Sequence, residues 1–246
     1  MKKQKEWFES WFSSPFYHIL YQDRDEREAA VFIDNIIKYL KPEPSAKILD
    51  AACGKGRHSI YLNQKGFDVT GIDLSVPSIE TAKRSENQKL SFYTHDIRKN
   101  FRIRYFDYIL NLFTSFGYFK DRSDNLRCLK AFKKALTPNG ILVIDFMNAK
   151  KAINSMKDHE SKVIGDIEFK ISKRIENGFI KKNISFYTNG KKNIFEESVQ
   201  ALSKEEFIEL LNECGLAVKD IFGNYQLEPF NENSSERLIL ICKMKQ

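Results

Sequence analysis

The sequence predicts an α/β fold in which a doubly wound, mostly parallel β-sheet carries an inserted antiparallel β-meander. Short apolar segments alternate with helical segments between residues 25 and 149, as parallel strands joined by crossover helices do. A small-residue turn holding Gly54 and Gly56 separates the first such strand from a helix. Further along, the pairs Asn177-Gly178 and Asn189-Gly190 interrupt alternating apolar residues, and Asn-Gly is a strong signal for a tight hairpin.

The elements are expected in the following order. A helix spans 25–40, because a charged start leads into an apolar stripe and Lys41-Pro42 ends it. Five strands follow with helices between them, and the last of these helices stops at a turn that contains Pro138 and Gly140. Beyond the meander, Ser203 and Glu206 form a capping-box pattern that opens another helix. The expected strands are 47–52, 67–72, 90–94, 106–112 and 140–146 before the meander, and 216–222 and 237–243 after it.

The chain therefore divides into four segments. Residues 1–24 form an aromatic N-terminal arm, 25–149 a ligand-binding core, 150–199 the inserted hairpins, and 200–246 the completion of the core sheet. The insertion is expected to have three strands. It could cover a ligand cleft, join two subunits or remain a surface hairpin.

Composition indicates a water-soluble globular protein. Of 246 residues, 42% are hydrophobic and 30% charged, and no run approaches the ~20 apolar residues that span a bilayer. The start of the chain is too polar for a signal peptide, so a cytoplasmic location without membrane contact is expected. The four cysteines lack metal-ligand spacing and indicate neither a zinc site nor a disulfide framework.

The glycine turn and two nearby acids predict a site for an adenine nucleoside. Gly54 and Gly56 allow backbone angles that let the main chain approach a ligand. Asp73 follows the turn at the spacing where an acid binds both ribose hydroxyls. Asp50, just before the turn, would repel a pyrophosphate but attract an ammonium group. The third glycine of a dinucleotide fingerprint is also absent, since Ser59 stands there. These details favour S-adenosylmethionine over NAD.

From about Asp25 to the C-terminus, the sequence resembles the class I S-adenosylmethionine-dependent methyltransferases. Their first motif is D-x-G-x-G-x-G, and this chain has Ala52 at the first glycine. The resemblance implies a Rossmann-like sheet of seven strands, no metal, and S-adenosylhomocysteine as product. In it, Asp96 binds the adenine amino group and Ile97 covers the ring. The expected cofactor-binding residues are Tyr17, Tyr21, Arg24, Asp50, Ala52, Gly54, Gly56, Arg57, Asp73, Leu74, Asp96, Ile97 and Asn111.

The segment after the fourth strand, residues 111–119, is expected to form the acceptor pocket. It lacks the N-P-P-Y or D-P-P-Y motif of enzymes that methylate base amines and glutamine, and it lacks a Pro-Cys pair. It resembles instead the S-x-G-Y loop of small-molecule methyltransferases, including those acting on sugar amines and glycine-like amines. The expected pocket residues are Phe113, Ser115, Phe116 and Tyr118, with core packing as the alternative for the two phenylalanines.

The arm resembles the N-terminal segment that closes over the cofactor in the small-molecule branch. Tyr17, Tyr21 and Arg24 match that segment in type and spacing, and Arg24 could pair with the methionine carboxylate. The alternative is a hydrophobic arm that packs Trp7 and Trp11 on the domain.

Candidate catalytic residues are His58, His18 and Tyr118. An amine acceptor must lose a proton, and histidine titrates in the useful range. His58 lies just after the glycine turn and is the first choice for a base, with His18 in the arm second. The alternative is a structural role for each histidine, because alignment alone can drive methyl transfer.

The sequence therefore predicts a methyltransferase that transfers a methyl group to nitrogen or oxygen of a small molecule, as a monomer or homodimer. Residues 150–192 hold 11 basic and 5 acidic residues, so an RNA methyltransferase using this insertion is one alternative. Only Arg174 among those basic residues is an arginine, so we do not expect a nucleic-acid partner. A non-catalytic cofactor-binding protein and a dehydrogenase are further alternatives.

Overall fold

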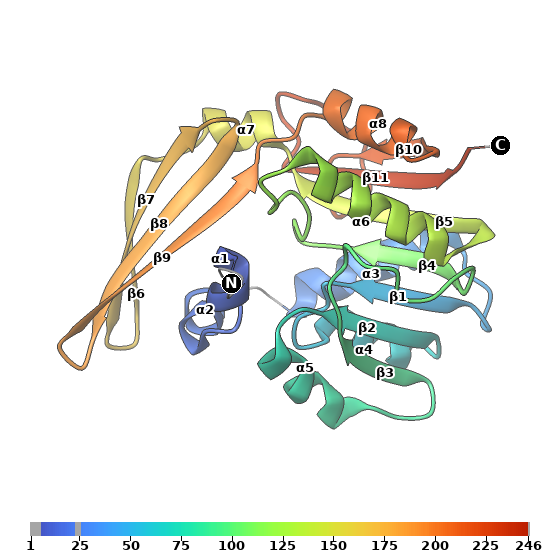
Figure 1. Cartoon of the computed structure of the whole chain (residues 1–246), viewed down its shortest axis with the longest axis horizontal. Helices are drawn as coiled ribbons and strands as arrows, with labels where there is room; N and C mark the ends of the chain where they lie inside the picture. Colours follow the sequence, from blue (N-terminus) through green and yellow to red (C-terminus); the bar gives the residue numbers. More distant parts are fainter. Residues whose placement is uncertain (1–5, 23–25, 246) are drawn as a thin grey trace, which may run out of the picture.

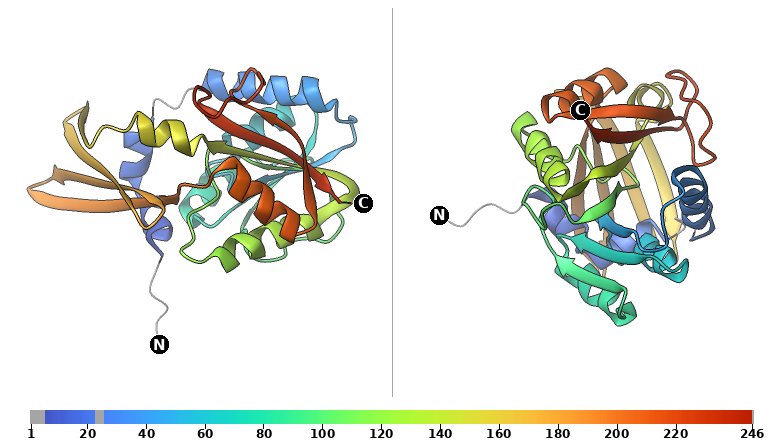
Figure 2. Two further views of the ribbon diagram at one scale, coloured as in Figure 1. Left: turned by 90° about the horizontal axis from the view of Figure 1, so that it is seen from above. Right: turned by 90° about the vertical axis from the view of Figure 1, so that its right-hand side faces the viewer.

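The computed structural model describes residues 6–22 and 26–245. Figure 1 shows a twisted seven-stranded sheet flanked by helices, a four-stranded sheet to one side, and two short N-terminal helices between the sheets. Figure 2 shows the smaller sheet projecting from the core sheet. Among the helices that the structure describes, none is both long and apolar enough to cross a membrane.

The core sheet has the strand order β10-β11-β5-β4-β1-β2-β3. Strands β1 to β5 pair in parallel, and β11 runs antiparallel to both β5 and β10. The predicted seven-stranded, mostly parallel sheet is confirmed. The chain order reverses between β1 and β4, which is where open parallel sheets bind ligands. The strands are β1 (Lys47–Ala51), β2 (Asp68–Asp73), β3 (Leu90–Thr94), β4 (Phe106–Asn111), β5 (Leu136–Met147), β10 (Leu216–Phe222) and β11 (Arg237–Met244).

Helices cover both faces of this sheet. One hydrophobic cluster joins the sheet to α6 and α8 through Leu129, Phe132 and Phe207, and a second joins it to α3, α4 and α5 through Phe32 and Leu62. The inner strands β1, β2, β4, β5 and β11 therefore bury side chains on both faces, as the central strands of a covered sheet do. The helices are α3 (Glu26–Leu40), α4 (Arg57–Gln64), α5 (Val76–Ala82), α6 (Arg122–Ala135), α7 (Ala149–Asn154) and α8 (Lys204–Glu213), with a 3₁₀ turn at Lys83–Ser85.

The insertion forms a separate antiparallel sheet in the order β6-β7-β8-β9. Both Asn-Gly turns are confirmed as hairpins, since Asn177 and Asn189 have φ of 52° and 50° and each following glycine is also left-handed. The prediction of three strands was wrong, because β6 adds a fourth. Its segment His159–Ile164 is mostly exposed, so it lacks the apolar alternation that marks a strand. The strands are β6 (His159–Ile164), β7 (Ile167–Glu176), β8 (Phe179–Thr188) and β9 (Lys191–Gln200).

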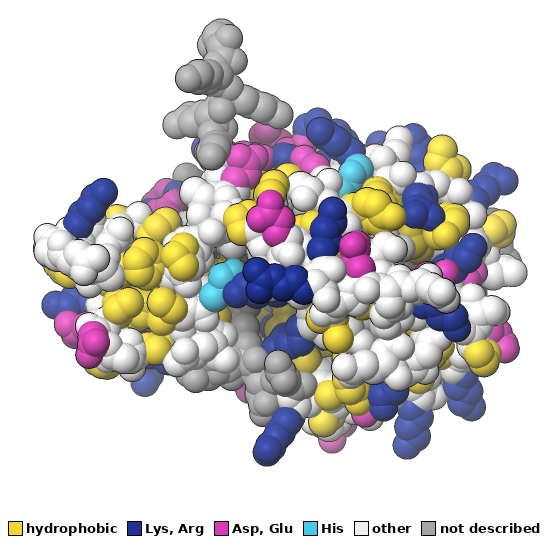
Figure 3. Space-filling model, turned by 90° about the horizontal axis from the view of Figure 1, so that it is seen from below, with side chains coloured by type: hydrophobic (Ala, Val, Ile, Leu, Met, Phe, Trp, Pro, Cys, Tyr) yellow, Lys and Arg dark blue, Asp and Glu magenta, His cyan; other side chains and the backbone are white. Residues whose placement is uncertain are grey.

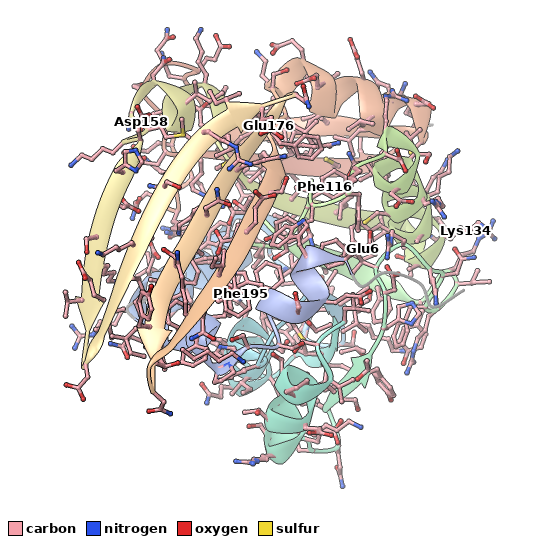
Figure 4. All side chains as sticks on the ribbon, turned by 60° about the vertical axis from the view of Figure 1, so that its left-hand side comes forward. Glu6, Phe116, Lys134, Asp158, Glu176 and Phe195 are labelled. Carbon is pink, nitrogen blue, oxygen red and sulfur yellow. The ribbon has the colours of Figure 1, made fainter. Side chains whose placement is uncertain are left out.

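The N-terminal arm packs against the inner face of this insertion sheet. Helices α1 (Trp7–Trp11) and α2 (Pro15–Leu20) contribute Trp11 and Leu20 to a third hydrophobic cluster, which also holds Phe169 and Phe186. The ring centroids of Trp11 and Phe195 are 4.5 Å apart, and Figure 4 shows Phe195 on β9 beside the arm helices. Aromatic packing on the insertion therefore anchors the arm.

Removing the cap of α8 should destabilise the fold by a small, measurable amount. Ser203 accepts a hydrogen bond from the Glu206 amide at 3.1 Å, and the Glu206 carboxylate accepts one from the Ser203 amide at 2.7 Å. Ser203→Ala should lower the free energy of unfolding by about 1 kcal/mol in urea denaturation. Ser161→Ala on exposed β6 is the control, with a change within about 0.5 kcal/mol. Equal urea midpoints for the two variants would contradict this cap assignment.

Candidate active site

A cavity of about 1550 Å³ lies at the carboxyl ends of the parallel strands. Its walls come from the glycine turn after β1, the loop after β4, the arm, and the inner face of the insertion sheet. Figure 3 shows a hollow between the core and the insertion, with basic side chains around its mouth. The cavity thus joins segments that are far apart in the sequence.

The two glycines of the turn have different surroundings. Gly54 has φ of 56° and lines the cavity, and a Cβ added there would meet no atom within 4 Å. Gly56 has φ of 82°, but its Cβ would lie 2.6 Å from the ring of Phe92. Gly54 therefore leaves space open beside the main chain. Gly56 does not line the cavity and instead allows α4 to approach β3 closely, a role that the glycine spacing does not reveal.

Asp50 places a buried carboxyl group at the end of β1. It is 1% exposed and accepts a hydrogen bond of 2.6 Å from the neutral hydroxyl of Ser59. Burial raises the pKa of Asp50 to about 6, although the Ser59 hydrogen bonds oppose that shift. The group is therefore ionised at neutral pH and poorly solvated, which favours a cationic ligand in the cavity.

Asp73 places a second carboxyl group at the end of the neighbouring strand β2. Its two oxygens accept hydrogen bonds from the Gly54 amide at 2.8 Å and the Ser75 amide at 2.7 Å. Burial raises the pKa of Asp73 despite these hydrogen bonds. Asp73 lines the cavity and also fixes the glycine turn, so one side chain links the turn to the ligand space.

Asp96 lies in the cavity wall after β3 and is paired with Arg98. The Arg98 guanidinium donates to both Asp96 oxygens, at 3.0 and 2.8 Å, and also to Glu6 at 2.8 Å and Asp124 at 3.1 Å. Burial alone would raise the pKa of Asp96, but the hydrogen bonds from Arg98 lower it overall. Arg98 was missed in the sequence, because its partners Glu6 and Asp124 are distant along the chain. It ties the start of the arm to the cavity wall.

The other end of the arm is tied to the insertion. Tyr17, His18 and Tyr21 all line the cavity. The Tyr21 hydroxyl donates to Glu197 on β9 at 2.7 Å, and Lys182 on β8 donates to that hydroxyl at 2.5 Å. The indole of Trp11 donates to the same Glu197 oxygen at 2.7 Å. Arg24, predicted to bind a carboxylate, lies outside the described residues.

Both candidate histidines are neutral at physiological pH. His58 is 7% exposed, and burial together with Arg57 lowers its pKa to about 3. Its Nε2 atom has no hydrogen-bond partner among the described residues. Burial and Lys55 lower the pKa of His18 to about 4. Both histidines line the cavity, but a pKa this low makes each a weak general base.

The loop after β4 brings part of the predicted acceptor pocket to the cavity. Phe113, Ser115 and Tyr118 line it, with the Tyr118 hydroxyl donating to the Thr114 carbonyl. Phe116, labelled in Figure 4, does not line the cavity, because it is 1% exposed. It packs in the core, with its ring centroid 5.6 Å from that of Phe207. The alternative of core packing holds for Phe116.

Most of the predicted cofactor residues also reach the cavity. Asn111 does not line it, because its buried amide donates to the Ala51 carbonyl at 3.0 Å and braces two strand ends. Among the described residues, no three His, Cys, Asp or Glu side chains gather as a metal site requires. The predicted site residues that line the cavity are Tyr17, His18, Tyr21, Asp50, Ala52, Gly54, Arg57, His58, Asp73, Leu74, Asp96, Ile97, Phe113, Ser115 and Tyr118.

Comparison with known proteins identifies the family. The model of a family described as "Methyltransferase domain" matches residues 42–212. The chain belongs to this methyltransferase family. It is 30% identical over 203 residues to the protein of Bacillus subtilis (strain 168) named "Putative methyltransferase YqeM", covering 78% of this chain and 81% of that one.

One further relative and one solved structure are similar to this chain. A glycine/sarcosine N-methyltransferase of Aphanothece halophytica is 26% identical over 215 residues, covering 84% of this chain and 79% of that one. The crystal structure of an S-adenosylmethionine-dependent methyltransferase from Clostridium acetobutylicum ATCC 824 has a TM-score of 0.80 at 21% identity, covering 94% and 96% of the two chains. The predicted resemblance to class I methyltransferases is confirmed.

Substituting the two glycines should separate ligand binding from packing in this methyltransferase. Gly54→Ala should cost about 1–2 kcal/mol in unfolding free energy from backbone strain alone. Its methyl group would occupy the open space, so S-adenosylhomocysteine should bind at least tenfold more weakly in calorimetry. Gly56→Ala is the matched control and should cost more stability, because its methyl group meets Phe92. Wild-type affinity in a folded Gly54→Ala protein would contradict this assignment.

Proposed function

We propose that the protein is an S-adenosylmethionine-dependent N-methyltransferase that acts on a small amine. The observation that carries the proposal is a pair of carboxyl groups at neighbouring strand ends, the buried Asp50 and the partly buried Asp73, which line the cavity together with Gly54. An ionised, poorly solvated carboxylate suits a ligand with ammonium and sulfonium charges. A carboxylate at the end of the second strand suits a ribose diol.

The donor would be held by residues at the strand ends. Asp73 would accept hydrogen bonds from the ribose hydroxyls, and Asp50 would attract the ammonium group. Asp96, fixed by Arg98, would accept from the adenine amino group, while Leu74 and Ile97 would contact the ring. The unpartnered Nε2 of His58 and the open space beside Gly54 are features of this chain that fit such a nucleoside.

The protein's contribution to methyl transfer would be alignment and exclusion of water. The bound donor would supply an electrophilic methyl group, so that the nitrogen–carbon bond would form as the sulfur–carbon bond broke to leave a thioether. The Phe12 ring packs against the rings of Tyr17 and Tyr118 in the cavity wall, with centroid distances of 4.9 and 5.4 Å. These rings would keep water from the reacting atoms while the amine proton leaves to solvent.

The histidines favour nitrogen over oxygen as the acceptor atom. An alcohol must lose its proton to become a good nucleophile, whereas a neutral amine already presents a lone pair. With the pKa of His58 at about 3 and that of His18 at about 4, neither is suited to deprotonate an alcohol. The glycine/sarcosine N-methyltransferase relative supports the same choice.

The charges of the insertion support a small molecule over RNA. Several of its basic side chains face glutamates across the strands, so they do not form an open cationic surface. The pairs are Lys173 with Glu160, Arg174 with Glu196, Lys181 with Glu176, and Lys182 with Glu197.

Matched acceptors test the proposal directly. We expect S-adenosylhomocysteine to bind in calorimetry, and methyl transfer from S-adenosylmethionine to glycine, sarcosine or an amino sugar. Glycolate, which has a hydroxyl in place of the amine of glycine, should not be methylated. Absence of donor binding would overturn the proposed function. Methylation of glycolate at the rate of glycine would overturn the choice of nitrogen.

Donor binding should weaken as the pH falls. Protonation of Asp50 below pH 6 would remove its attraction for the cationic donor, because its pKa is raised to about 6. The dissociation constant of S-adenosylhomocysteine should rise about tenfold from pH 7 to pH 5 in calorimetry. A constant affinity across this range would contradict the role of Asp50.

Asp50→Asn is the control for this pH dependence. The folded-state pKa lies above the ordinary value, so the ionised carboxylate destabilises the ligand-free fold once the pH rises through about 6. The variant should therefore bind the donor weakly with a flatter pH profile. Its free energy of unfolding should exceed that of the wild type by more at pH 8 than at pH 5.

A further inference from the structure

The loop after β4 holds a backbone conformation that its own residues disfavour. Phe113 and Thr114 have φ of 56° and 59°, so two successive residues with side chains are left-handed. Threonine is β-branched, and such residues rarely adopt this region without an external constraint. Contacts from outside the loop must therefore maintain it.

Asp145, near the end of β5, supplies contacts to both residues. Its Oδ2 accepts a hydrogen bond from the Phe113 amide at 2.8 Å. Its main-chain carbonyl accepts one from the Thr114 amide at 2.9 Å. A single residue thus satisfies both amides of the left-handed pair.

Arg237, at the start of β11, completes the arrangement. Its Nε donates to Asp145 Oδ1 at 2.7 Å, and its Nη2 donates to the Thr114 hydroxyl at 3.0 Å. The Asp145 side chain is 0% exposed and that of Arg237 is 19% exposed, so the ion pair is shielded from solvent. The Tyr225 hydroxyl also donates to Asp145 Oδ2, at 3.3 Å. These contacts fix the carboxylate itself.

These contacts determine where the loop after β4 places its part of the cavity wall. The Phe113 ring lies between His58 and Tyr225, with centroid distances of 5.0 and 5.4 Å. Thr114 lines the cavity, and its carbonyl accepts the Tyr118 hydroxyl. A relaxed backbone at 113–114 would move this wall relative to the glycine turn.

We propose that Asp145 is a positioning residue for methyl transfer, which holds Phe113 and Thr114 in the left-handed conformation that aligns the acceptor with the donor. This inference rests on the proposed function and deepens it. Asp145 acts through the loop, and Arg237 orients its carboxylate through the hydrogen bond to Oδ1. Asp145 is separate from the acids Asp50, Asp73 and Asp96 that would hold the donor.

Asp145→Asn tests the proposal. The Asn side-chain NH₂ group would face either the Phe113 amide or the Arg237 guanidinium, and each of these is itself a donor, so one of the two hydrogen bonds is lost. With the best amine acceptor of the panel, kcat should fall at least tenfold while S-adenosylhomocysteine affinity stays within twofold. Asp145→Asn/Thr114→Gly should recover most of the lost kcat, since glycine adopts the left-handed region unaided. Thr114→Gly alone, which removes the hydroxyl that Arg237 contacts, is the reference against which this recovery is measured. Asp107→Asn, at the amino end of β4, is the matched control, with kcat within twofold.

Hydrogen exchange supplies a readout that needs no turnover. In Asp145→Asn, amides in the peptide 112–118 should exchange at least tenfold faster, while those of β1 stay unchanged. Unchanged exchange, wild-type kcat, or a loss of kcat that Thr114→Gly does not restore would each overturn the proposal. If the wild type methylates no amine, the proposed function fails, and the exchange rates alone decide the role of Asp145.

Discussion

The organisation of this protein depends on one electrostatic constraint, a carboxylate buried at the end of β1 beside a neutral hydroxyl. Asp50 has Ser59 as its hydrogen-bond partner, and burial raises its pKa to about 6. Such a group destabilises the ligand-free fold and favours any cation that enters the cavity. The strand, the glycine turn and the helix after it hold the carboxylate away from bulk water. In the proposed function, this carboxylate prepares the cavity for a positively charged ligand before one arrives.

The arm and the insertion make this environment possible. The start of the arm is bound through Glu6 to Arg98 at 2.8 Å, and its end through Tyr21 to Glu197 at 2.7 Å. Between these points, Trp11 and Phe195 pack at 4.5 Å. Because the arm is held at both ends, it links the core to the insertion sheet. Figure 1 shows its helices α1 and α2 between the two sheets, and their residues line the cavity. The arm thus forms part of the cavity wall and also connects the core with the insertion.

The sequence predicts those features that local pattern determines. Apolar periodicity located the strands of the core, and Asn-Gly pairs located two hairpins. The strand at 159–164 was not predicted, because it is an edge strand whose side chains are largely exposed. Gly56 lies against Phe92, and Phe116 packs in the core against Phe207. Both contacts involve residues that are distant in the sequence. The same holds for Arg98, whose bond to Glu6 spans 92 positions. Spacing within a motif cannot reveal such partners.

The two buried aspartates near the ends of β1 and β5 differ in their surroundings alone. Asp145 is paired with Arg237 at 2.7 Å and accepts two further hydrogen bonds, so its lone pairs are already directed within the protein. Asp50 accepts from the neutral Ser59 hydroxyl and lines the cavity. The first carboxylate can only fix its neighbours, whereas the second retains an attraction for an external cation. In this sheet, the partner of each acid determines whether it shapes the site or binds within it.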